Sequence, residues 1–401
     1  MNNKDEFGEI DEYNDRTRKI GHESYKSLQP TFIKIEETQT QMILDGKTQK
    51  LGESTESTIV EEFWEYYLQF SPSNLPNFTS YYGNESAELK MTILIRVFQD
   101  FCLERVYPPS FPVPIIQKAF KNSKNNSSHA AKFFFVGDTH GSMIDTMRLV
   151  PFFVKEIEKG ILNDYKVKIV FIGDFIDRND LDIHNILYLM TFNLRYPNNV
   201  LLLRGNHEEI SVCAHYGFGK KVVDRFSQML FASFCNLFKD LPLMAIYHCQ
   251  QGSVLCLHGG IPIYVDEETG KYKILNITTY QYDNRHVWLD DMDKISQQIL
   301  WNDPIINYDP ENMPPFFTSK RGMGYWFGEE VFDEFCEKNK ISLIFRGHQV
   351  FLDGIHKEFR QRFITIFSAS DYAKKKIKAR FIEMNSDDIF NYKVHVIQDL
   401  P

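Results

Sequence analysis

The stretch AKFFFVGDTHG, residues 131–141, joins an apolar run to a glycine-flanked turn that contains Asp and His. The run 133–136 has the length and uniform apolar character of a strand that is buried on both faces, as strands are in α/β layers. The turn after it places a carboxylate, Asp138, and an imidazole, His140, at the strand end. Ligands of open α/β sheets bind outside the carboxyl ends of the strands. The stretch therefore predicts a central strand and one part of a ligand site.

Four more apolar runs repeat this arrangement at 168–172, 200–203, 253–257 and 342–345. Each is followed by a turn with glycine and with Asp, Asn or His, and helical patterns separate the runs. Two further strands are expected at 362–367 and 389–397. This alternation predicts a single large α/β domain over residues 130–398. The polar residues at the five strand ends are Asp138, His140, Asp174, Asn206, His258 and His348.

These six side chains offer imidazole nitrogens, carboxylate oxygens and an amide oxygen, but no thiolate, a set that suits divalent first-row metal ions. Six ligands exceed what one tetrahedral ion needs. They fit two ions about 3.5–4 Å apart with one bridging carboxylate. A single turn of this kind is usually a solvated loop, but five of them at strand ends predict a dinuclear metal site.

The chain before this domain has a different character. Residues 1–55 are polar and mixed in charge, which predicts a disordered N-terminal arm. Residues 56–121 are expected to form a helical extension, with one helix starting at a capping box at Thr58 and a second over roughly 86–104. Two helices do not easily close a core of their own, so we expect them to pack on the α/β domain. The polar segment 122–129 is expected to be a linker.

Composition excludes several classes of protein. The 401 residues carry 54 Asp and Glu against 45 Lys and Arg, for a net charge of −9, which argues against sequence-independent nucleic-acid binding. No apolar run is long enough for a membrane span, and the first residues lack the apolar segment of a secretory signal. The six cysteines are scattered without a C-x-x-C pair, as is typical of reduced proteins. We therefore expect a protein of the cytoplasm, the nucleus or both.

In their order along the chain, the motifs GDTHG, GDFIDR, LRGNHE, HGG and RGH resemble those of the eukaryotic phosphoprotein phosphatases. This family of dinuclear-metal Ser/Thr phosphatases includes protein phosphatase 1, protein phosphatase 2A and calcineurin. LWNDP at 300–304 and FSASDY at 367–372 are further similarities, and the resemblance covers roughly 130–398. It implies the calcineurin-like metallophosphoesterase fold, an α/β fold with two mixed β-sheets in a central sandwich flanked by helices.

The resemblance also implies roles for single residues. One metal ion would be held by Asp138, His140 and Asp174, and the other by Asp174, Asn206, His258 and His348, with Asp174 bridging. His207 matches the family's catalytic histidine, and Asp177 matches the carboxylate that orients it. Arg346 falls on an arginine position in or around the phosphate site. The residues that would contact the substrate phosphate are Arg178, Arg321, Asn206 and Tyr372.

The implied reaction is hydrolysis of phosphoserine and phosphothreonine in proteins by a hydroxide that bridges two divalent ions, with His207 as general acid. The ions would be manganese or an iron and zinc pair. The implied partners are phosphoprotein substrates and regulatory subunits. Two alternatives stay open: a metallophosphoesterase of small phosphoesters or dinucleotide polyphosphates, and a catalytically weak scaffold of the same fold.

The sequence departs from the family pattern beside the expected site. Asn179 stands where the family has glycine, and Asp180 after it adds a carboxylate that could slow catalysis. Ser370 and Asp371 replace the usual Pro-Asn, so the loop over the site is expected to be remodelled. The basic run 374–380 follows, for which a solvated loop is favoured over a docking patch.

Overall fold

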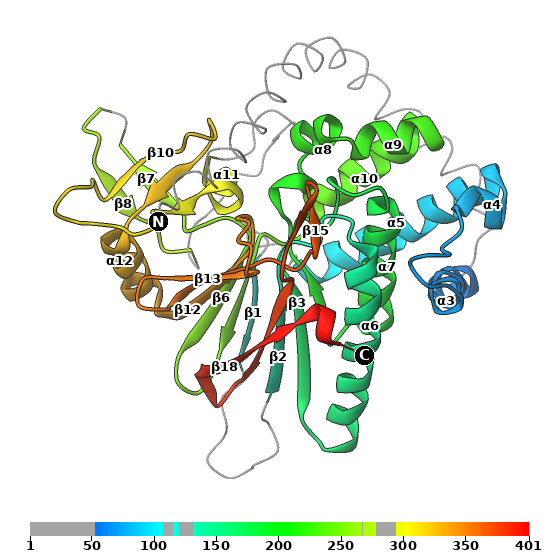
Figure 1. The fold of residues 1–401 in the computed structure, drawn as a ribbon, viewed down its shortest axis with the longest axis horizontal. Coiled ribbons are helices and arrows are strands. Elements are labelled where there is room, and N and C mark those ends of the chain that lie inside the picture. Colours follow the sequence, from blue (N-terminus) through cyan, green and yellow to red (C-terminus); the bar gives the residue numbers. More distant parts are fainter. Residues whose placement is uncertain (1–52, 107–114, 120–130, 267, 278–293, 401) are drawn as a thin grey trace.

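The computed structural model of the protein describes residues 53–106, 115–119, 131–266, 268–277 and 294–400. Two β-sheets pack face to face within these residues, and helices cover the outer side of each sheet (Figure 1). Both sheets contain parallel and antiparallel strand pairs. The expected sandwich of two mixed sheets flanked by helices is therefore confirmed.

The first sheet has five strands in the order β18-β17-β2-β3-β4. Its parallel part consists of β2 (Ala131–Val136), β3 (Lys166–Phe171) and β4 (Val200–Leu202). β17 (Arg380–Asn385) and β18 (Asp388–Val396) continue the sheet with antiparallel pairing. The strands expected in these regions are confirmed with small shifts at their ends, whereas β17 was not predicted.

The second sheet has six strands in the order β1-β5-β6-β12-β14-β13. The predicted strands in it are β6 (Ser253–Leu257), β12 (Ile341–Arg346) and β14 (Phe363–Ile366), which run parallel to one another. The strands that precede the five polar turns are thus divided between the sheets. A parallel β-bridge between Asp138 and Phe367 joins the loop after β2 to the loop after β14. The polar turns consequently meet where the ends of both sheets come together. The other members are β1 (Ile115–Ala119), β5 (Met244–His248) and β13 (Ile355–Glu358).

The apolar character of the strands is explained by cores on both of their faces. Between the sheets, the ring of Phe135 on β2 stacks on that of Phe345 on β12 with 4.3 Å between centroids. The outer face of the five-stranded sheet packs against α6 (Met143–Leu162) and α7 (Asp182–Arg195). The outer face of the six-stranded sheet packs against α11 (Lys294–Trp301) and α12 (Glu329–Asn339). Strands enclosed in this way have no polar face to present to water.

Shorter elements connect these layers and carry part of the site. They are the turn η1 (Asn206–Glu208), the helices α8 (Ile210–Tyr216), α9 (Phe218–Arg225) and α10 (Gln228–Asp240), the strands β7 (Ile263–Val265), β8 (Tyr272–Ile274), β9 (Asp303–Pro304), β10 (Phe316–Thr318), β11 (Tyr325–Phe327), β15 (Asp371–Tyr372) and β16 (Lys375–Lys376), and the turn η2 (Ile397–Asp399). The six cysteines are all buried and unbridged. Among the residues described, no helix combines the length and the apolarity needed to cross a bilayer.

Three N-terminal helices, α3 (Glu53–Gln69), α4 (Phe78–Tyr82) and α5 (Asn84–Val106), belong to the same core as α6 and α7. The ring of Phe78 stacks on the imidazole of His184 in α7 with 4.1 Å between centroids. The hydroxyl of Tyr67 donates a hydrogen bond to the backbone oxygen of His184 at 3.0 Å. The expectation that the helices pack on the α/β domain is therefore confirmed, and Figure 1 shows them beside α7.

Two expected boundaries in the N-terminal region are wrong. Helix α3 begins at Glu53, so the last residues of the expected arm 1–55 are helical, because Thr58 and Glu61 are tolerated inside a helix and a capping box does not force a start. The expected helical extension 56–121 also contains a strand, since β1 pairs in parallel with β5. The four prolines between 108 and 114 disfavour a continuous helix over the expected range, and Ile115 and Ile116 favour extended backbone. Residues 1–52 and the expected linker 122–129 lie outside the described residues.

Candidate metal centre

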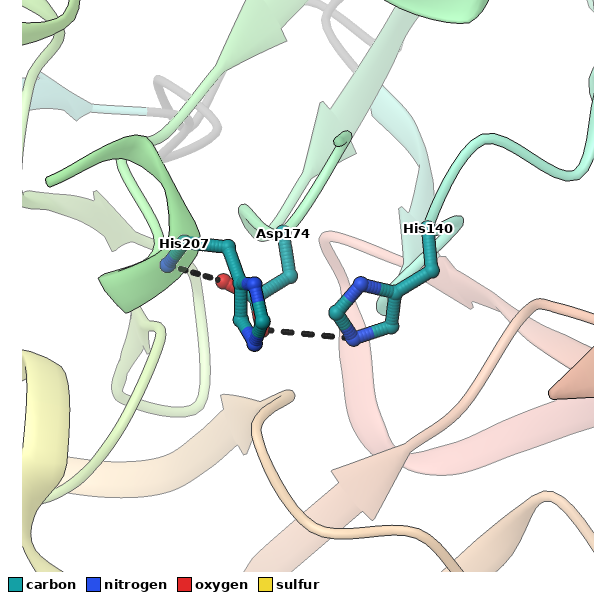
Figure 2. Close-up of side chains that lie close together, drawn as sticks. All are labelled: His140, Asp174 and His207. Atoms are coloured by element: carbon teal, nitrogen blue, oxygen red, sulfur yellow. Dashed lines mark hydrogen bonds and ion pairs between the residues drawn. The ribbon is translucent and has the colours of Figure 1, made fainter. Parts of the chain in front are cut away.

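The carboxylate of Asp174, at the end of β3, lies between imidazoles from the two sheets. Its Oδ2 is 3.4 Å from Nε2 of His140, which follows β2. Its Oδ1 is 3.2 Å from Nε2 of His258, which follows β6 in the other sheet. Figure 2 shows His140, Asp174 and His207 directed toward one another from three different loops. The two oxygens of one carboxylate therefore face two different sets of ligand atoms.

Asn206 and His348 complete the side of the site that belongs to His258. The Oδ1 atom of Asn206 lies 2.9 Å from Nε2 of His258 and 2.9 Å from Nδ1 of His348. Among the described residues, two groups have ligand atoms within 4.8 Å of one another: His140, Asp174 and His207, and Asp174, His258 and His348. Asp174 is common to both groups. The structure therefore brings the predicted residues of both groups to one place.

Asp138 lies at the same place, although its oxygens belong to neither of these two close groups. Its Oδ2 is 3.8 Å from Nε2 of His140, and its Oδ1 and Oδ2 accept the backbone N–H of His348 at 2.9 and 3.1 Å. His207 takes its place in the first close group. Asp138 thus joins the loop after β2 to the loop after β12.

The donor atoms fit divalent metal ions. The Nε2 atom of His348 is buried and has no hydrogen-bond partner, which a coordinated ion would supply. Burial lowers the pKa of His140 to about 3 and that of His348 well below its usual range, so both imidazoles are neutral, the form that binds metals. Burial also raises the pKa of Asp138 to about 7. Burial disfavours its charged form, and a nearby cation would stabilise that form.

Several residues at the site have backbone φ angles that L-residues rarely adopt. His140, Asp174 and His348 have φ angles of 41°, 53° and 72°, in the left-handed region that L-residues rarely adopt. Later in the loop after β3, Asp177 and Arg178 have φ angles of 65° and 72°. Such strain persists only where surrounding structure holds it, and it is concentrated at functional sites.

Close approach explains two of the glycines beside the ligands. A Cβ atom on Gly347 would lie 2.2 Å from Oδ1 of Asp138. A Cβ atom on Gly205 would lie 2.3 Å from the backbone nitrogen of Asp174. A side chain at either position would push apart the loops that bring the ligands together.

Glu208 is a supporting residue for which no role was predicted, although it ends the motif LRGNHE. Its carboxylate accepts the backbone N–H groups of Asp174 at 2.8 Å, Phe175 at 2.7 Å and Gly205 at 2.9 Å. It therefore holds the loop after β3 against the loop after β4. The available signal was an acidic residue directly after Asn206 and His207, but its partners are backbone groups that no motif reveals.

His207 and Asp177 form a buried pair beside the metal ligands. Nδ1 of His207 is 2.7 Å from Oδ2 of Asp177. The other oxygen of Asp177 accepts the backbone N–H of Phe218 at 2.8 Å, and the N–H of His207 donates to Asp174 at 2.9 Å. The orientation of the imidazole is consequently fixed from both sides.

Two of the predicted phosphate-binding residues, Arg178 and Tyr372, lie against each other, and a third, Arg321, is held by Asp303. The guanidinium of Arg178 lies 4.3 Å from the ring centroid of Tyr216 and 5.5 Å from that of Tyr372. The ring of Tyr372 is in turn 5.0 Å from that of His140. Arg321 donates from Nε to Asp303 at 2.8 Å. Asp303 was not predicted as a site residue, although it belongs to the motif LWNDP.

Arg346 is held by neighbouring protein groups through its whole guanidinium. Its side chain is fully buried, and it donates to the backbone oxygen of Gly259, to Gln349 and to Asp303. These protein partners occupy each of its three nitrogens. The residue therefore joins β12 to neighbouring loops, and it shares Asp303 with Arg321 around the expected phosphate site.

Asn179, at the position of a family glycine, makes contacts that a glycine lacks. Its Nδ2 donates to the backbone oxygen of His140 at 2.8 Å and to that of Asp371 at 3.1 Å. The left-handed angles of this turn fall on Asp177 and Arg178 instead, so Asn179 fits without strain. Asp180 is exposed. Asn179 thus connects the loops after β2 and β3 to β15.

Comparisons with known proteins agree with this geometry. Residues 131–351, more than half of the chain, match the family model described as calcineurin-like phosphoesterase. The chain belongs to the calcineurin-like phosphoesterase family, and its matching region is a catalytic domain of the phosphoprotein phosphatase type. The expected fold and family resemblance are confirmed.

Curated relatives are Ser/Thr protein phosphatases. The chain is 32% identical over 249 residues to serine/threonine-protein phosphatase T of Saccharomyces cerevisiae, covering 62% of this chain and 44% of that protein. It is 30% identical over 257 residues to the serine/threonine-protein phosphatase 4 catalytic subunit of the same yeast, covering 64% and 75%. Identity to serine/threonine-protein phosphatase 5 of Rattus norvegicus is 30% over 270 residues, covering 64% and 47%. The chain therefore spans less than half of the length of phosphatase T and of phosphatase 5, and three quarters of the phosphatase 4 catalytic subunit.

A solved structure supports the fold independently. A protein serine/threonine phosphatase from Saccharomyces cerevisiae with similarity to human phosphatase PP5 superposes with a TM-score of 0.57 at 24% identity. The alignment covers 77% of this chain and 89% of that one. It therefore extends over most of both chains.

Proposed function

We propose that this protein hydrolyses phosphoserine and phosphothreonine in other proteins with the help of two divalent metal ions. The observation that carries the proposal is the position of Asp174, whose two carboxylate oxygens face His140 on one side and His258 on the other. The relatives named as Ser/Thr protein phosphatases support the substrate class.

We assign one ion to Asp138, His140 and Asp174, and the other to Asp174, Asn206, His258 and His348. The neutral imidazoles of His140 and His348 and the buried carboxylate of Asp138 support this assignment. When bound, divalent ions supply an acidified water and positive charge for the phosphoryl oxygens. The oxygen and nitrogen donors suit manganese or an iron and zinc pair.

His207 would deliver the proton that the departing seryl or threonyl oxygen needs. Burial lowers the pKa of His207 to about 3, but burial also raises the pKa of Asp177 to about 7. The two groups share a short hydrogen bond, so the pair keeps one proton up to near neutral pH, whichever atom carries it. A bound proton at this place is what a general acid requires.

Four residues would hold the phosphate. Arg178 offers a planar guanidinium over two aromatic rings, and such a fork matches phosphoryl oxygens bidentately. Arg321 has its guanidinium oriented by Asp303 through Nε. Asn206 lies between His258 and His348, and Tyr372 covers the His140 side.

We further propose that the protein works in the cytoplasm or nucleus together with regulatory subunits. Its unbridged cysteines fit a reducing compartment. The helices α3, α4 and α5 add a surface beside the catalytic domain to which such a subunit could bind.

The test is hydrolysis of a phosphothreonine peptide, a dinucleotide polyphosphate and p-nitrophenyl phosphate by the full chain with added manganese. We expect the peptide to be turned over much faster than the dinucleotide. Preference for the dinucleotide would instead identify the protein as a phosphoesterase of small molecules. Two bound metal ions without hydrolysis of any of the three would identify a scaffold.

A further inference from the structure

The hairpin of β15 and β16, residues 371–378, combines high positive charge with a position at the metal centre. It contains Lys374, Lys375, Lys376 and Lys378 against a single carboxylate, Asp371. The rest of the chain is acidic overall, with a net charge of −9 for the whole sequence. A local excess of lysines next to a phosphate site is therefore a feature of this hairpin and not of the general surface.

The strand register directs one of these lysines toward the centre. Tyr372 pairs with Lys375 in the antiparallel hairpin, and Asp371 pairs with Lys376. Residues that are directly opposite on antiparallel strands project from the same face. The ring of Tyr372 lies 5.0 Å from His140, so Lys375 shares the face that looks toward the metal ligands. Lys376 is on the other face, where it forms an ion pair with Asp371 at 2.6 Å.

Hydrogen bonds hold the backbone of the hairpin to the site. Asn179 donates to the oxygen of Asp371 at 3.1 Å, and the N–H of Ser370 donates to Asp145 at 2.7 Å. The N–H of Lys378 donates to the oxygen of Leu352 at 2.9 Å. Tyr372 and Ile377 are buried in one apolar cluster with Phe367 and Ala369. The lysines are thus solvated side chains, as the expected solvated loop implies, but the backbone that carries them is a fixed hairpin.

We infer that this hairpin selects substrates, and that the protein prefers phosphoserine and phosphothreonine with acidic or additional phosphorylated residues nearby in the sequence. The inference rests on the proposed function and specifies its substrate class. Lys374 and Lys378 are exposed and Lys375 is half-buried, so a bound peptide can reach them. The exposed Asp180 is a nearby carboxylate on the loop that Asn179 joins to the hairpin, but four lysines outnumber it and Asp371 together.

The expected size of the preference follows from exposed ion pairs. One such pair changes an equilibrium by a factor of about 2–5, and salt screens it. Three lysines acting together on an acidic peptide should give a preference of roughly 10-fold at low ionic strength. The preference should decrease as salt is added, because these charges are exposed.

The experiment compares two phosphothreonine peptides that are identical except for Glu or Gln at the flanking positions. The readout is kcat/KM for the wild type, for Lys374→Gln/Lys375→Gln/Lys378→Gln and for the charge reversal Lys374→Glu/Lys375→Glu. A matched control, Lys155→Glu/Lys271→Glu, changes exposed lysines outside the hairpin. Lys155 lies twelve residues into α6, about 18 Å along the helix from its start. Metal content and thermal midpoint verify that each variant is folded.

We expect the wild type and the control to prefer the Glu peptide, the neutral variant to lose the preference, and the charge reversal to favour the Gln peptide. Equal kcat/KM for both peptides in the wild type, or an unchanged preference in the hairpin variants, would overturn the inference while leaving the phosphatase assignment intact. Measuring how the same peptides bind to His207→Ala separates the role of the hairpin from the proposed hydrolysis. Charge-dependent binding without turnover by the wild type would uphold the hairpin's role and reject the proposed reaction.

Discussion

The Nδ1 atom of His207 lies 2.7 Å from a carboxylate oxygen of Asp177, and both side chains are buried beside the ligand cluster. His207 comes from the turn after β4 and Asp177 from the loop after β3. Asp177 is itself held by the N–H of Phe218. The pair therefore presents the imidazole in a fixed orientation and keeps a proton next to the expected phosphate position.

Removal of this imidazole should abolish proton donation without disturbing the metals. His207→Ala is expected to lower kcat on a phosphothreonine peptide by about 10²–10⁴-fold, the usual contribution of a positioned acid. Metal analysis should still find two ions per chain, because the assigned ligands remain. His356→Ala, on β13 outside the motifs, is the matched control and should keep wild-type turnover. Loss of metal together with activity would show that His207 is a ligand instead.

Asn179 should matter for substrate binding more than for chemistry. Asn179→Gly restores the residue of the family pattern but removes hydrogen bonds to His140 and Asp371, each worth about 0.5–1.5 kcal/mol. We expect KM for a phosphopeptide to rise several-fold, because β15 loses its tie to the site, with a smaller change in kcat. Asn179→Asp keeps the shape and removes the donor, so it should behave similarly. Unchanged steady-state constants in both variants would show that the tie is dispensable.

The N-terminal helices should contribute to stability through their aromatic contact with α7. Phe78→Ala leaves a cavity against His184 and is expected to lower the free energy of unfolding by about 3–5 kcal/mol. Phe390→Ala is the control, since that ring is 54% exposed, and it should change stability by less than about 0.5 kcal/mol. Denaturant melts of the full chain give both values. Equal stabilities of the two variants would mean that the helices add little to the core.

Glu383, on β17 of the five-stranded sheet, should contribute to the free energy of unfolding in a way that depends on pH. The hydrogen bond from His395, aided by Lys132 and opposed by burial, lowers its pKa from 4.5 to about 2. A lowered folded-state pKa stabilises the fold above the unfolded value and loses that effect as pH falls through the folded value. Glu383→Gln should therefore cost about 0.5–1 kcal/mol at pH 6, and the difference from wild type should vanish between about pH 4.5 and pH 2. A constant difference in the free energy of unfolding across this pH range would contradict the lowered pKa of Glu383.

The sequence predicted the parts of the fold that have a local signature. Strands such as β2 and β12 are apolar throughout because both faces are buried, and glycines mark the turns where the ligands approach one another. Glu208 and Asp303 went unassigned because their roles depend on backbone N–H groups and arginines from distant loops. β1 was missed because a short strand is defined by its partner, and the residues of β5 that pair with it lie 129 positions further along the chain. The role of Asn179 was likewise invisible, since its acceptors belong to two other loops.

The proposed position of Asp174 between two metal ions can be observed by locating the ions themselves. Anomalous diffraction from crystals grown with manganese should show two peaks in the wild type, one beside His140 and one beside His258 and His348, with the Asp174 carboxylate between them. Asp174→Asn should lose most of both peaks, while His348→Ala should lose mainly one. A single peak in the wild type, or two peaks that persist unchanged in Asp174→Asn, would contradict the account.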